Sequence, residues 1–307
     1  MVMTAGNASD WSYTEAFLRN RGLVGEDEQQ RLRNSRVAVA GLGGVGGIDL
    51  VTLVRLGIGK FTIADPDVFE IRNTNRQYGA MRSTEGQGKA DVMCSIVRDI
   101  NPEIDIRVIR EPLGETNADA FLHGANVLVD GIDAFEIDLR RLLFAKARAS
   151  GIYALGAGPV GFSTVWTIFG PRGMTFDRYF DLDDAMDPVE KFVAYVVGMA
   201  PAAVQKTYMD LSHLDFANRS GPSASLACHL ASGVIGAEVL KILLDRGPIR
   251  TAPYYQQFDA YVGRLVRRRL PGGNRHPLQR LKRRWLTRYI RRRLRDTVTP
   301  DDANERP

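Results

Sequence analysis

The sequence contains few of the residues that bind zinc or form disulfides. Its 307 residues include only two cysteines, Cys94 and Cys228, and four scattered histidines, and no Cys-x-x-Cys pair occurs. A structural zinc site of the common type needs four thiolate or imidazole ligands at close spacing, which this pattern does not supply. We therefore expect no zinc, and we expect both cysteines to pack as small buried apolar side chains.

The chain also lacks a long hydrophobic run. The longest nearly apolar stretch, residues 192–204, is interrupted by Pro201 and is shorter than the ~20 residues that cross a bilayer. Near the start, no apolar stretch follows basic residues, as a secretory signal would require. A hydrophobic content of 44% and a charged content of 25% are those of an ordinary soluble globular protein. We expect a cytoplasmic protein.

Acidic residues are absent from one segment near the end of the chain. Residues 264–295 contain fourteen arginines or lysines and no aspartate or glutamate, whereas the whole chain has 41 basic and 36 acidic residues. The basic character therefore belongs to a C-terminal tail, which we place at residues 273–307, and the body that carries it is acidic.

Helical spacing in this tail aligns the apolar residues in two rows. The first row is Leu278, Leu281, Trp285 and Tyr289, and the second is Leu286, Ile290 and Leu294. An apolar face flanked by cations suits an anionic membrane surface, here the inner face of the cell membrane. The cations alone would suit RNA phosphates. A partner protein, a dimer mate or the acidic body of the same chain would also cover such a helix.

The most informative segment begins with an apolar strand, residues 37–40, that runs into a glycine-rich turn and then a helical pattern. The turn supplies four glycines that we expect to bind a nucleotide: Gly41, Gly43, Gly44 and Gly46. A strand that turns on glycines into a helix presents backbone N–H groups and a helix N-terminus to phosphate. Asp65 ends the next strand, where a carboxylate can accept hydrogen bonds from ribose, and Asp67 is a further candidate acceptor.

Two cations follow the second strand. Arg76 lies in the cluster Asn73-Thr74-Asn75-Arg76-Gln77, and Lys89 follows at the start of a helical pattern. A nicotinamide site performs no pyrophosphate transfer and has no need of such cations. Together with the glycine turn they therefore indicate a site for a nucleoside triphosphate.

These motifs resemble the adenylating domain of the ThiF/MoeB/HesA family, whose members are related to ubiquitin-activating enzymes. The resemblance spans roughly residues 15–260 and rests on the glycine turn, the two aspartates after the second strand, the Asn73–Gln77 cluster, Lys89 and Asp130-Gly131-Ile132-Asp133. Within the family, the Asn73–Gln77 cluster is similar to that of the tRNA threonylcarbamoyladenosine dehydratases. The resemblance implies ATP and Mg²⁺ as cofactors.

The resemblance also implies roles for individual residues. Arg76 and Lys89 meet the phosphates, where cations stabilise the charge that develops on the α-phosphate and on pyrophosphate. Asn73 orients this pair and Gln77 supports Arg76. Asp133 is the expected Mg²⁺ ligand, because Mg²⁺ is commonly held by one carboxylate together with substrate phosphates.

The family pattern further implies a homodimer in which an N-terminal arginine reaches the partner's site. Arg19 matches this arginine, with Arg21 as the alternative. The sequence departs from the pattern after Asp133, because the arginine usual in the family is missing from its place, and Arg140 or Arg141 could substitute. Residues 174–222, where thioester-forming relatives carry a cysteine, contain none, so no covalent enzyme intermediate is implied.

The order of predicted elements indicates the fold. Strands and helices alternate over residues 36–133, which predicts an α/β protein with a doubly wound, mostly parallel, Rossmann-like sheet. Residues 158–161 are expected to form a hairpin turn, Asp187 to cap a helix that begins at Pro188, and residues 222–245 to form a buried helix. We assign an N-terminal helical segment to residues 1–35, an adenylation domain to residues 36–272, and the basic helical tail to residues 273–307.

The expected function is ATP- and Mg²⁺-dependent adenylation of a carboxylate. The sequence leaves the substrate open among a ubiquitin-like protein or peptide C-terminus, a small molecule and a modified nucleoside. Two alternatives come from other classes. An NAD-dependent oxidoreductase would use the glycine turn and Asp65 but leaves Arg76, Lys89 and Asp133 without roles. A non-catalytic nucleotide-binding adaptor would need none of the reaction chemistry.

Overall fold

The computed structural model describes residues 11–298, so the first ten residues of the predicted N-terminal segment and residues 299–307 of the predicted tail lie outside the described part. The helices are α1 (Tyr13–Ala16), α2 (Glu26–Asn34), α3 (Gly46–Arg55), α4 (Lys89–Ile100), α5 (Ala118–Leu122), α6 (Ile137–Ala149), α7 (Phe176–Phe180), α8 (Pro188–Met199), α9 (Ser225–Leu244) and α10 (Pro277–Val298). The strands are β1 (Arg36–Ala40), β2 (Lys60–Ala64), β3 (Asp105–Ile109), β4 (Val127–Asp130), β5 (Tyr153–Val160), β6 (Ser163–Phe169), β7 (Tyr254–Asp259) and β8 (Arg264–Arg269).

All eight strands join one sheet in the order β3-β2-β1-β4-β5-β6-β7-β8. The first five are parallel, with Val39 of β1 paired with Ile63 of β2 on one side and Val129 of β4 on the other. The last three strands, β6, β7 and β8, add on in antiparallel orientation. The prediction of an α/β fold with a mostly parallel sheet is confirmed, and its parallel half carries the motifs.

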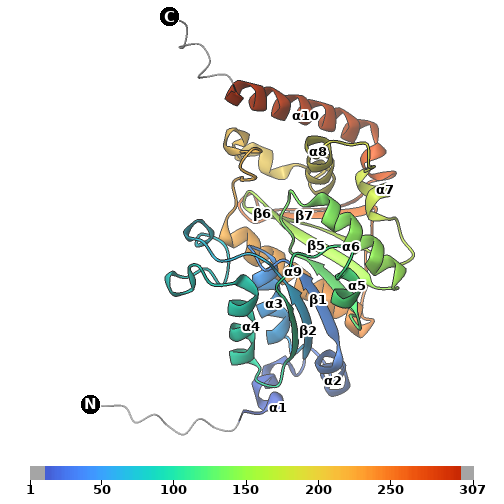
Figure 1. Ribbon diagram of the computed structural model, residues 1–307. Coiled ribbons are helices and arrows are strands. Elements are labelled where there is room, and N and C mark those ends of the chain that lie inside the picture. Colours follow the sequence, from blue (N-terminus) through green and yellow to red (C-terminus); the bar gives the residue numbers. More distant parts are fainter. Residues whose placement is uncertain (1–10, 299–307) are drawn as a thin grey trace, which may run out of the picture.

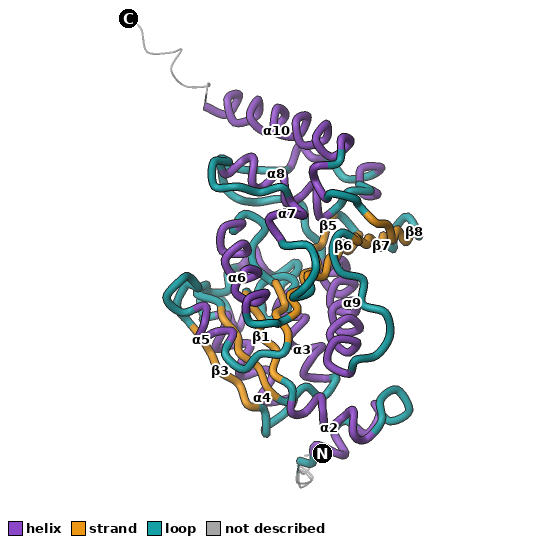
Figure 2. The backbone as a smooth tube through the Cα atoms, turned by 90° about the vertical axis from the view of Figure 1, so that its right-hand side faces the viewer, coloured by secondary structure: helices purple, strands orange, loops and turns teal. Residues whose placement is uncertain are grey.

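Helices cover both faces of the sheet, which explains why β1 is buried along its whole length. Side chains alternate along the strand: Val37 and Val39 pack in one core with α3, α4 and α9, whereas Ala38 and Ala40 pack in the other with α5 and α6. Figure 2 shows α9 and α6 on opposite sides of the strands. The carboxyl ends of the parallel strands are therefore positioned rigidly by two cores.

Local signals place several boundaries. Asp187 accepts a hydrogen bond from the backbone N–H of Glu190 at 2.9 Å and Pro188 opens α8, as predicted. The hairpin turn differs from the prediction, because β5 continues to Val160 and pairs there with Ser163. The turn needs only two residues, since Gly161 adopts a φ of 62°, which glycine accepts without strain.

Helix α9 is the longest apolar helix of the fold. Among residues 11–298 it is the one helix whose length and composition would suffice to cross a membrane, and 56% of its most apolar window is buried inside the molecule. It packs against α3 and against β5 and β6. The prediction of a buried helix in this region is confirmed.

The C-terminal helix α10 packs on α8. Leu286 and Ile290, from the second apolar row, join Phe192 and Val193 in a small core of their own. Ion pairs flank this core, with Arg283 2.7 Å from Asp181 and Arg291 3.0 Å from Glu190. Thus the acidic body of the chain covers one side of the helix, one of the outcomes left open by the sequence. Figure 1 shows α10 at the end of the molecule opposite α2.

Asp49 of α3 is an unusual member of the core beside the glycine turn. Its side chain is fully buried between α3 and α9, and neither carboxylate oxygen has a hydrogen-bond partner among the described residues. Burial raises the pKa of Asp49 well above its ordinary value, because a charged carboxylate is poorly solvated there. The folded protein therefore keeps this carboxyl protonated to a higher pH than the unfolded chain does.

We expect Asp49→Asn to stabilise the protein increasingly as pH rises. The unfolded chain releases the Asp49 proton above a pKa near 3.8 while the folded chain retains it, so wild-type stability falls with pH until the raised folded pKa is passed. Asparagine keeps the shape and does not titrate. Urea unfolding near pH 5 and near pH 8 checks this, with Asp99→Asn on the exposed side of α4 as control. A variant that is equally destabilised at both pH values would contradict it.

Candidate functional site

The turn after β1 and the turn after β4 touch each other through their backbones. Gly41 has a φ of 82°, and a Cβ atom on Gly46 would lie 1.9 Å from the Gly41 carbonyl oxygen. A Cβ atom on Gly131 would lie 2.6 Å from the same oxygen. Only glycine fits at these positions, and the contact leaves the N-terminus of α3 open at the carboxyl edge of the sheet, where its first N–H groups can bind phosphate.

Asp65 fastens the glycine turn to the end of β2. Its carboxylate accepts hydrogen bonds from the backbone N–H groups of Leu42, at 2.7 Å, and Asp67, at 2.9 Å. Burial raises the pKa of Asp65, and these hydrogen bonds together with the nearby Lys89 oppose the rise. An ionised carboxylate can accept about four hydrogen bonds, so ribose binding by Asp65, which stays a prediction, is compatible with this anchoring role.

Lys89 stands at the first position of α4 with its side chain buried. Its Nζ lies 3.0 Å from the Asp67 carboxylate, which is itself largely exposed, and its backbone N–H donates to the Asp67 carbonyl. The structure thus brings Asp67 and Lys89, both predicted site residues, together as an ion pair. Asp67 holds the lysine beside the glycine turn, and ATP phosphates would offer the lysine a second partner.

Asn73 shapes the segment between β2 and α4. Its side-chain oxygen accepts from the backbone N–H of Glu70, and its carbonyl accepts from the N–H groups of both Arg76 and Gln77. Asn73 therefore fixes the turn that presents Arg76 and Gln77, and it does so by accepting hydrogen bonds from backbone N–H groups.

The side chains of Arg76 and Gln77 pack directly on the glycine turn. A Cβ atom on Gly44 would lie 3.5 Å from Arg76 Cγ, and one on Gly43 would lie 3.6 Å from Gln77 Nε2. Gln77 Oε1 is buried and has no hydrogen-bond partner within residues 11–298. In the same part of the chain no carboxylate lies within ion-pair distance of Arg76, whose guanidinium donates to the Arg72 carbonyl and Asn75. Both side chains keep capacity for a ligand.

Cys228 of α9 lies under the same turn. Its sulfur would be 3.3 Å from a Cβ atom on Gly44, and the residue has no solvent exposure. Burial raises the pKa of Cys228 to about 11, although the Arg76 guanidinium lowers it. Cys94 is also buried and its pKa is raised by burial. Both thiols are protonated at neutral pH and act as apolar packing.

A buried ion pair holds the turn after β4. Arg140 Nε lies 2.7 Å from Asp130 Oδ2, both side chains are almost fully buried, and the guanidinium also donates to the carbonyls of Ile132 and Asp133. Arg141 instead pairs with Asp177 and Asp184, beside α7. Both arginines thus have structural partners here, and the substitution of either for the missing family arginine stays a prediction.

Arg219 is the residue that sequence reasoning missed. Its guanidinium lies 2.6 Å from Glu136 and 3.7 Å from Asp133, over the ring of Phe135. It reaches this position from a tight turn between Asp215 and Ser220, whose backbones exchange two hydrogen bonds. No local motif marks Arg219, because its place depends on contacts more than eighty residues away in the sequence.

The turn that carries Arg219 is anchored by aromatic packing. The ring of Phe216 lies 5.5 Å from those of both Phe135 and Phe192 in edge-on contacts, and Phe135 stacks on Phe192 at 4.4 Å. Phe135 follows Asp133 closely, so this cluster ties the Arg219 turn to the predicted Mg²⁺ ligand. The side chain of Asp133 itself is more than half exposed.

Arg19 lies far from these residues in its own chain. It belongs to a short 3-10 helix, Leu18–Asn20, which is joined to Leu56 by a hydrogen bond from Asn20. Leu56 precedes β2, and hence lies at the amino edge of the parallel strands, opposite the glycine turn. Arg19 could serve a site only in a partner subunit, and this role stays a prediction.

The site combines three features: a glycine turn at a helix N-terminus, a carboxylate at the end of the next strand, and cations packed on the turn. This combination is typical of a nucleotide-binding α/β protein. The ThiF family model matches residues 17–281. The chain belongs to the ThiF family, as the sequence motifs indicated.

Curated relatives match over part of this chain. A tRNA threonylcarbamoyladenosine dehydratase of Bacillus subtilis is 37% identical over 118 residues, which are 38% of this chain and 46% of that protein. A SAMP-activating enzyme E1 of Haloferax volcanii is 33% identical over 157 residues, 51% of this chain and 57% of that protein. The chain thus spans about half the length of the curated relatives it matches.

Solved structures match over more of the chain. The crystal structure of PaaA has a TM-score of 0.64 at 16% identity and covers 87% of this chain and 86% of that one. The Escherichia coli tRNA N6-threonylcarbamoyladenosine dehydratase TcdA in complex with ATP has a TM-score of 0.56 at 23% identity, covering 77% and 96%. Escherichia coli MccB with ATP has a TM-score of 0.61 at 17% identity, covering 87% and 72%. These likenesses show a shared fold.

Proposed function

We propose that this protein uses Mg–ATP to adenylate a carboxylate. The observation that carries the proposal is the packing of Arg76 and Gln77 on the glycine turn. Among the described residues the Arg76 guanidinium has no carboxylate partner and the Gln77 amide oxygen has no hydrogen-bond partner, at the place where phosphate would bind. Buried Lys89 adds a second cation beside the same turn. Family membership supports an enzyme, and a solved ThiF-fold neighbour carries ATP.

The proposed reaction needs no protein nucleophile. A substrate carboxylate oxygen attacks the α-phosphorus of ATP, the bond to the β-phosphate oxygen breaks, and an acyl adenylate and pyrophosphate result. The chain contributes positioning and fixed positive charge. Arg76 and Lys89 face the charge that develops on the phosphates, and the backbone of the glycine turn holds the nucleotide in place.

Asp133 fits the role of Mg²⁺ ligand. Its carboxylate is more than half exposed, whereas Asp130 is paired with Arg140 and Asp67 with Lys89. The described residues hold no cluster of three or more acidic, histidine or cysteine side chains. One carboxylate suffices, because Mg²⁺ commonly takes its remaining ligands from substrate phosphates and water. Mg²⁺ bound with ATP would neutralise phosphate charge.

Arg219 is proposed to orient the substrate carboxylate. In this structure its guanidinium is balanced by Glu136 and Asp133, and binding of Mg²⁺ to Asp133 would leave it one acidic partner fewer. A planar guanidinium matches a carboxylate through two hydrogen bonds. The arginine that the family pattern places after Asp133 would thus be supplied from the Asp215–Ser220 turn instead.

The names of the relatives indicate two classes of carboxylate substrate. The relatives are named for action on a modified tRNA nucleoside and on a small modifier protein. We therefore propose a carboxylate on a peptide or small-protein C-terminus or on a modified nucleoside. Exchange of labelled pyrophosphate into ATP, with each class offered in turn, identifies it, and neither an oxidoreductase nor a binding adaptor would catalyse that exchange.

We expect Mg–ATP, but not NADH, to protect the protein against thermal unfolding. At a hundredfold excess over the dissociation constant the stabilisation should be about 2.7 kcal/mol. Arg76→Ala and Lys89→Ala should lose most of it, because each removes a cation from the phosphates. Arg72→Ala is the matched control, since Arg72 lies in the same segment but is paired with Glu70. Protection by NADH and none by ATP would overturn the proposed function.

We expect Arg219→Ala to act on the carboxylate and Asp133→Ala on the reaction as a whole. With the carboxylate that supports pyrophosphate exchange, Arg219→Ala should raise its KM about tenfold or more while the KM for ATP stays near wild type, as loss of a charged hydrogen bond implies. Asp133→Ala should lower exchange roughly 10²-fold. Arg178→Ala, on α7, is the control. An Arg219→Ala effect confined to ATP would contradict the assignment.

We also expect a homodimer in which Arg19 completes the partner's site. Neither Arg19→Ala nor Asp133→Ala protein should catalyse exchange well alone. After subunit exchange the mixture should regain activity, because one site of each mixed dimer then has both Arg19 and Asp133. Sedimentation measures the dimer. Absence of recovery despite proven mixing would remove Arg19 from the site.

A further inference from the structure

We propose that the outward face of α10 attaches this protein to membranes rich in anionic lipid. The proposal is independent of the adenylation chemistry and rests on how the structure divides the side chains of this helix. Four of the seven residues in the two apolar rows, and part of the cations, pack on the body of the molecule. The other side chains remain available on a surface at one end of the protein (Figure 1).

The apolar residues of α10 divide into a covered set and an exposed set, and Tyr289 of the first row belongs to the covered set. Leu286 and Ile290 are packed on α8, and Ile290 is only 3% exposed. Leu278, Leu281 and Trp285, in contrast, are 62%, 64% and 57% exposed. These three lie at positions i, i+3 and i+7 of a helix and so form one stripe. Three large apolar side chains in a row on one exposed face indicate a contact surface, because isolated exposures are common but aligned ones are not.

The cations divide in the same way. Arg283 is paired with Asp181, and Arg291 with Asp187 and Glu190, and these pairs fix α10 to its own protein. Lys282 donates to the Pro201 carbonyl. Because Arg283, Arg291 and Lys282 are bound to the body of the molecule, they contribute little to the binding of an external partner.

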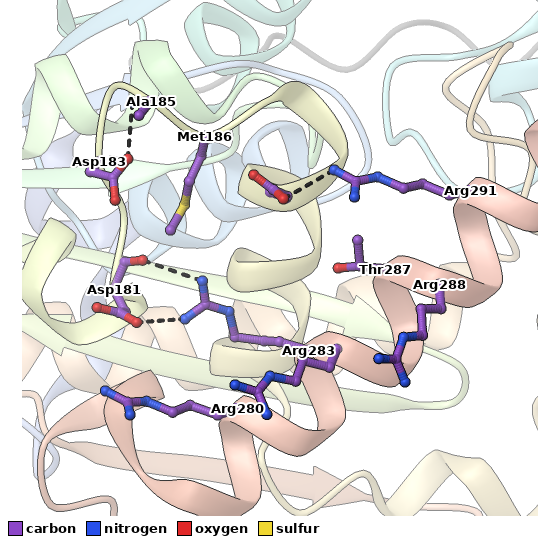
Figure 3. A pocket seen from close by; sticks show the side chains of 11 residues that line it. Asp181, Asp183, Ala185, Met186, Arg280, Arg283, Thr287, Arg288 and Arg291 are labelled. Carbon is purple, nitrogen blue, oxygen red and sulfur yellow. Dashed lines mark hydrogen bonds and ion pairs between the residues drawn. The ribbon is translucent and has the colours of Figure 1, made fainter.

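Three other arginines have no carboxylate partner in the part of the chain that the structure describes: Arg280, Arg284 and Arg288. They are four residues apart, so they follow one another along the same side of the helix at intervals of about 6 Å. Together they border a recess of about 600 Å³ that Asp181, Asp183 and Met186 close on the other side. Figure 3 shows Arg280 and Arg288 without a dashed contact, whereas Arg283 points to Asp181.

The arginine row and the apolar stripe are neighbours on the outward half of the helix. Arg288 follows Leu281 by seven residues, so the two stripes share a border. A helix with this pattern lies in the plane of an anionic bilayer, with leucine and tryptophan at the acyl boundary and arginine at the phosphates. RNA phosphates would engage the arginines but have no use for the leucine stripe, and this difference favours lipid.

The test is co-sedimentation of the full-length protein with vesicles. We expect binding to phosphatidylcholine vesicles that contain phosphatidylglycerol and much weaker binding to phosphatidylcholine alone. The triple variant Arg280→Gln, Arg284→Gln, Arg288→Gln should lose on the order of a hundredfold in affinity, because each basic residue near the surface contributes about fivefold. The double variant Leu281→Ser, Trp285→Ser should lose at least tenfold.

A matched control separates this surface from net charge. Arg264→Gln, Arg268→Gln, Arg269→Gln removes three exposed arginines from β8 and should keep most of the affinity. Every variant should retain protection by Mg–ATP, which shows that it folds. Equal losses in the two triple variants would overturn the proposal, as would binding of tRNA with steep salt dependence and none of vesicles. A third result would also overturn it: the wild type is a dimer that does not bind vesicles, and the Leu281→Ser, Trp285→Ser variant is a monomer.

Discussion

The site depends on a backbone contact between two turns. Gly41, Gly46 and Gly131 bring the turn after β1 and the turn after β4 so close that no side chain fits between them. This contact joins the turn that we propose to hold phosphate to the part of the chain that carries Asp133. Asp65, Lys89 and the Asn73 turn are arranged around it, and the Asp130–Arg140 pair stiffens its second half. A buried pair of this kind fixes geometry more surely than it adds stability.

Much of this arrangement could be predicted from the sequence because it is local. The glycines follow a strand directly, Asp65 ends the next strand, and the carboxyl ends of parallel strands share one edge of a sheet. The helix cap at Asp187 is likewise written in consecutive residues. Family resemblance then extended these local signals to Arg76, Lys89 and Asp133. Arg76 packs on the glycine turn and Lys89 pairs with Asp67, and the roles of all three residues stay predictions.

What could not be predicted depends on contacts between distant segments. Arg219 reaches Asp133 only because Phe216 packs on Phe135 and Phe192, and no periodicity in the sequence encodes that cluster. Arg140 looks like any helix arginine in the sequence, yet it is buried with Asp130. In the tail, amphipathic spacing revealed both apolar rows, but only the position of α8 decides that Ile290 is covered and Leu281 is not.

The last strand of the sheet, β8, affects the tendency of the protein to aggregate at high concentration. The outer edge of β8 offers unpaired backbone groups to any passing strand, a common route to fibrils. Four of its six residues are exposed arginines, Arg264, Arg267, Arg268 and Arg269, so a second copy pairing there would set arginine against arginine. The arginines that contribute to the basic charge of this chain therefore also protect the edge of its sheet. Their mutual repulsion opposes the growth of the sheet from one molecule into the next.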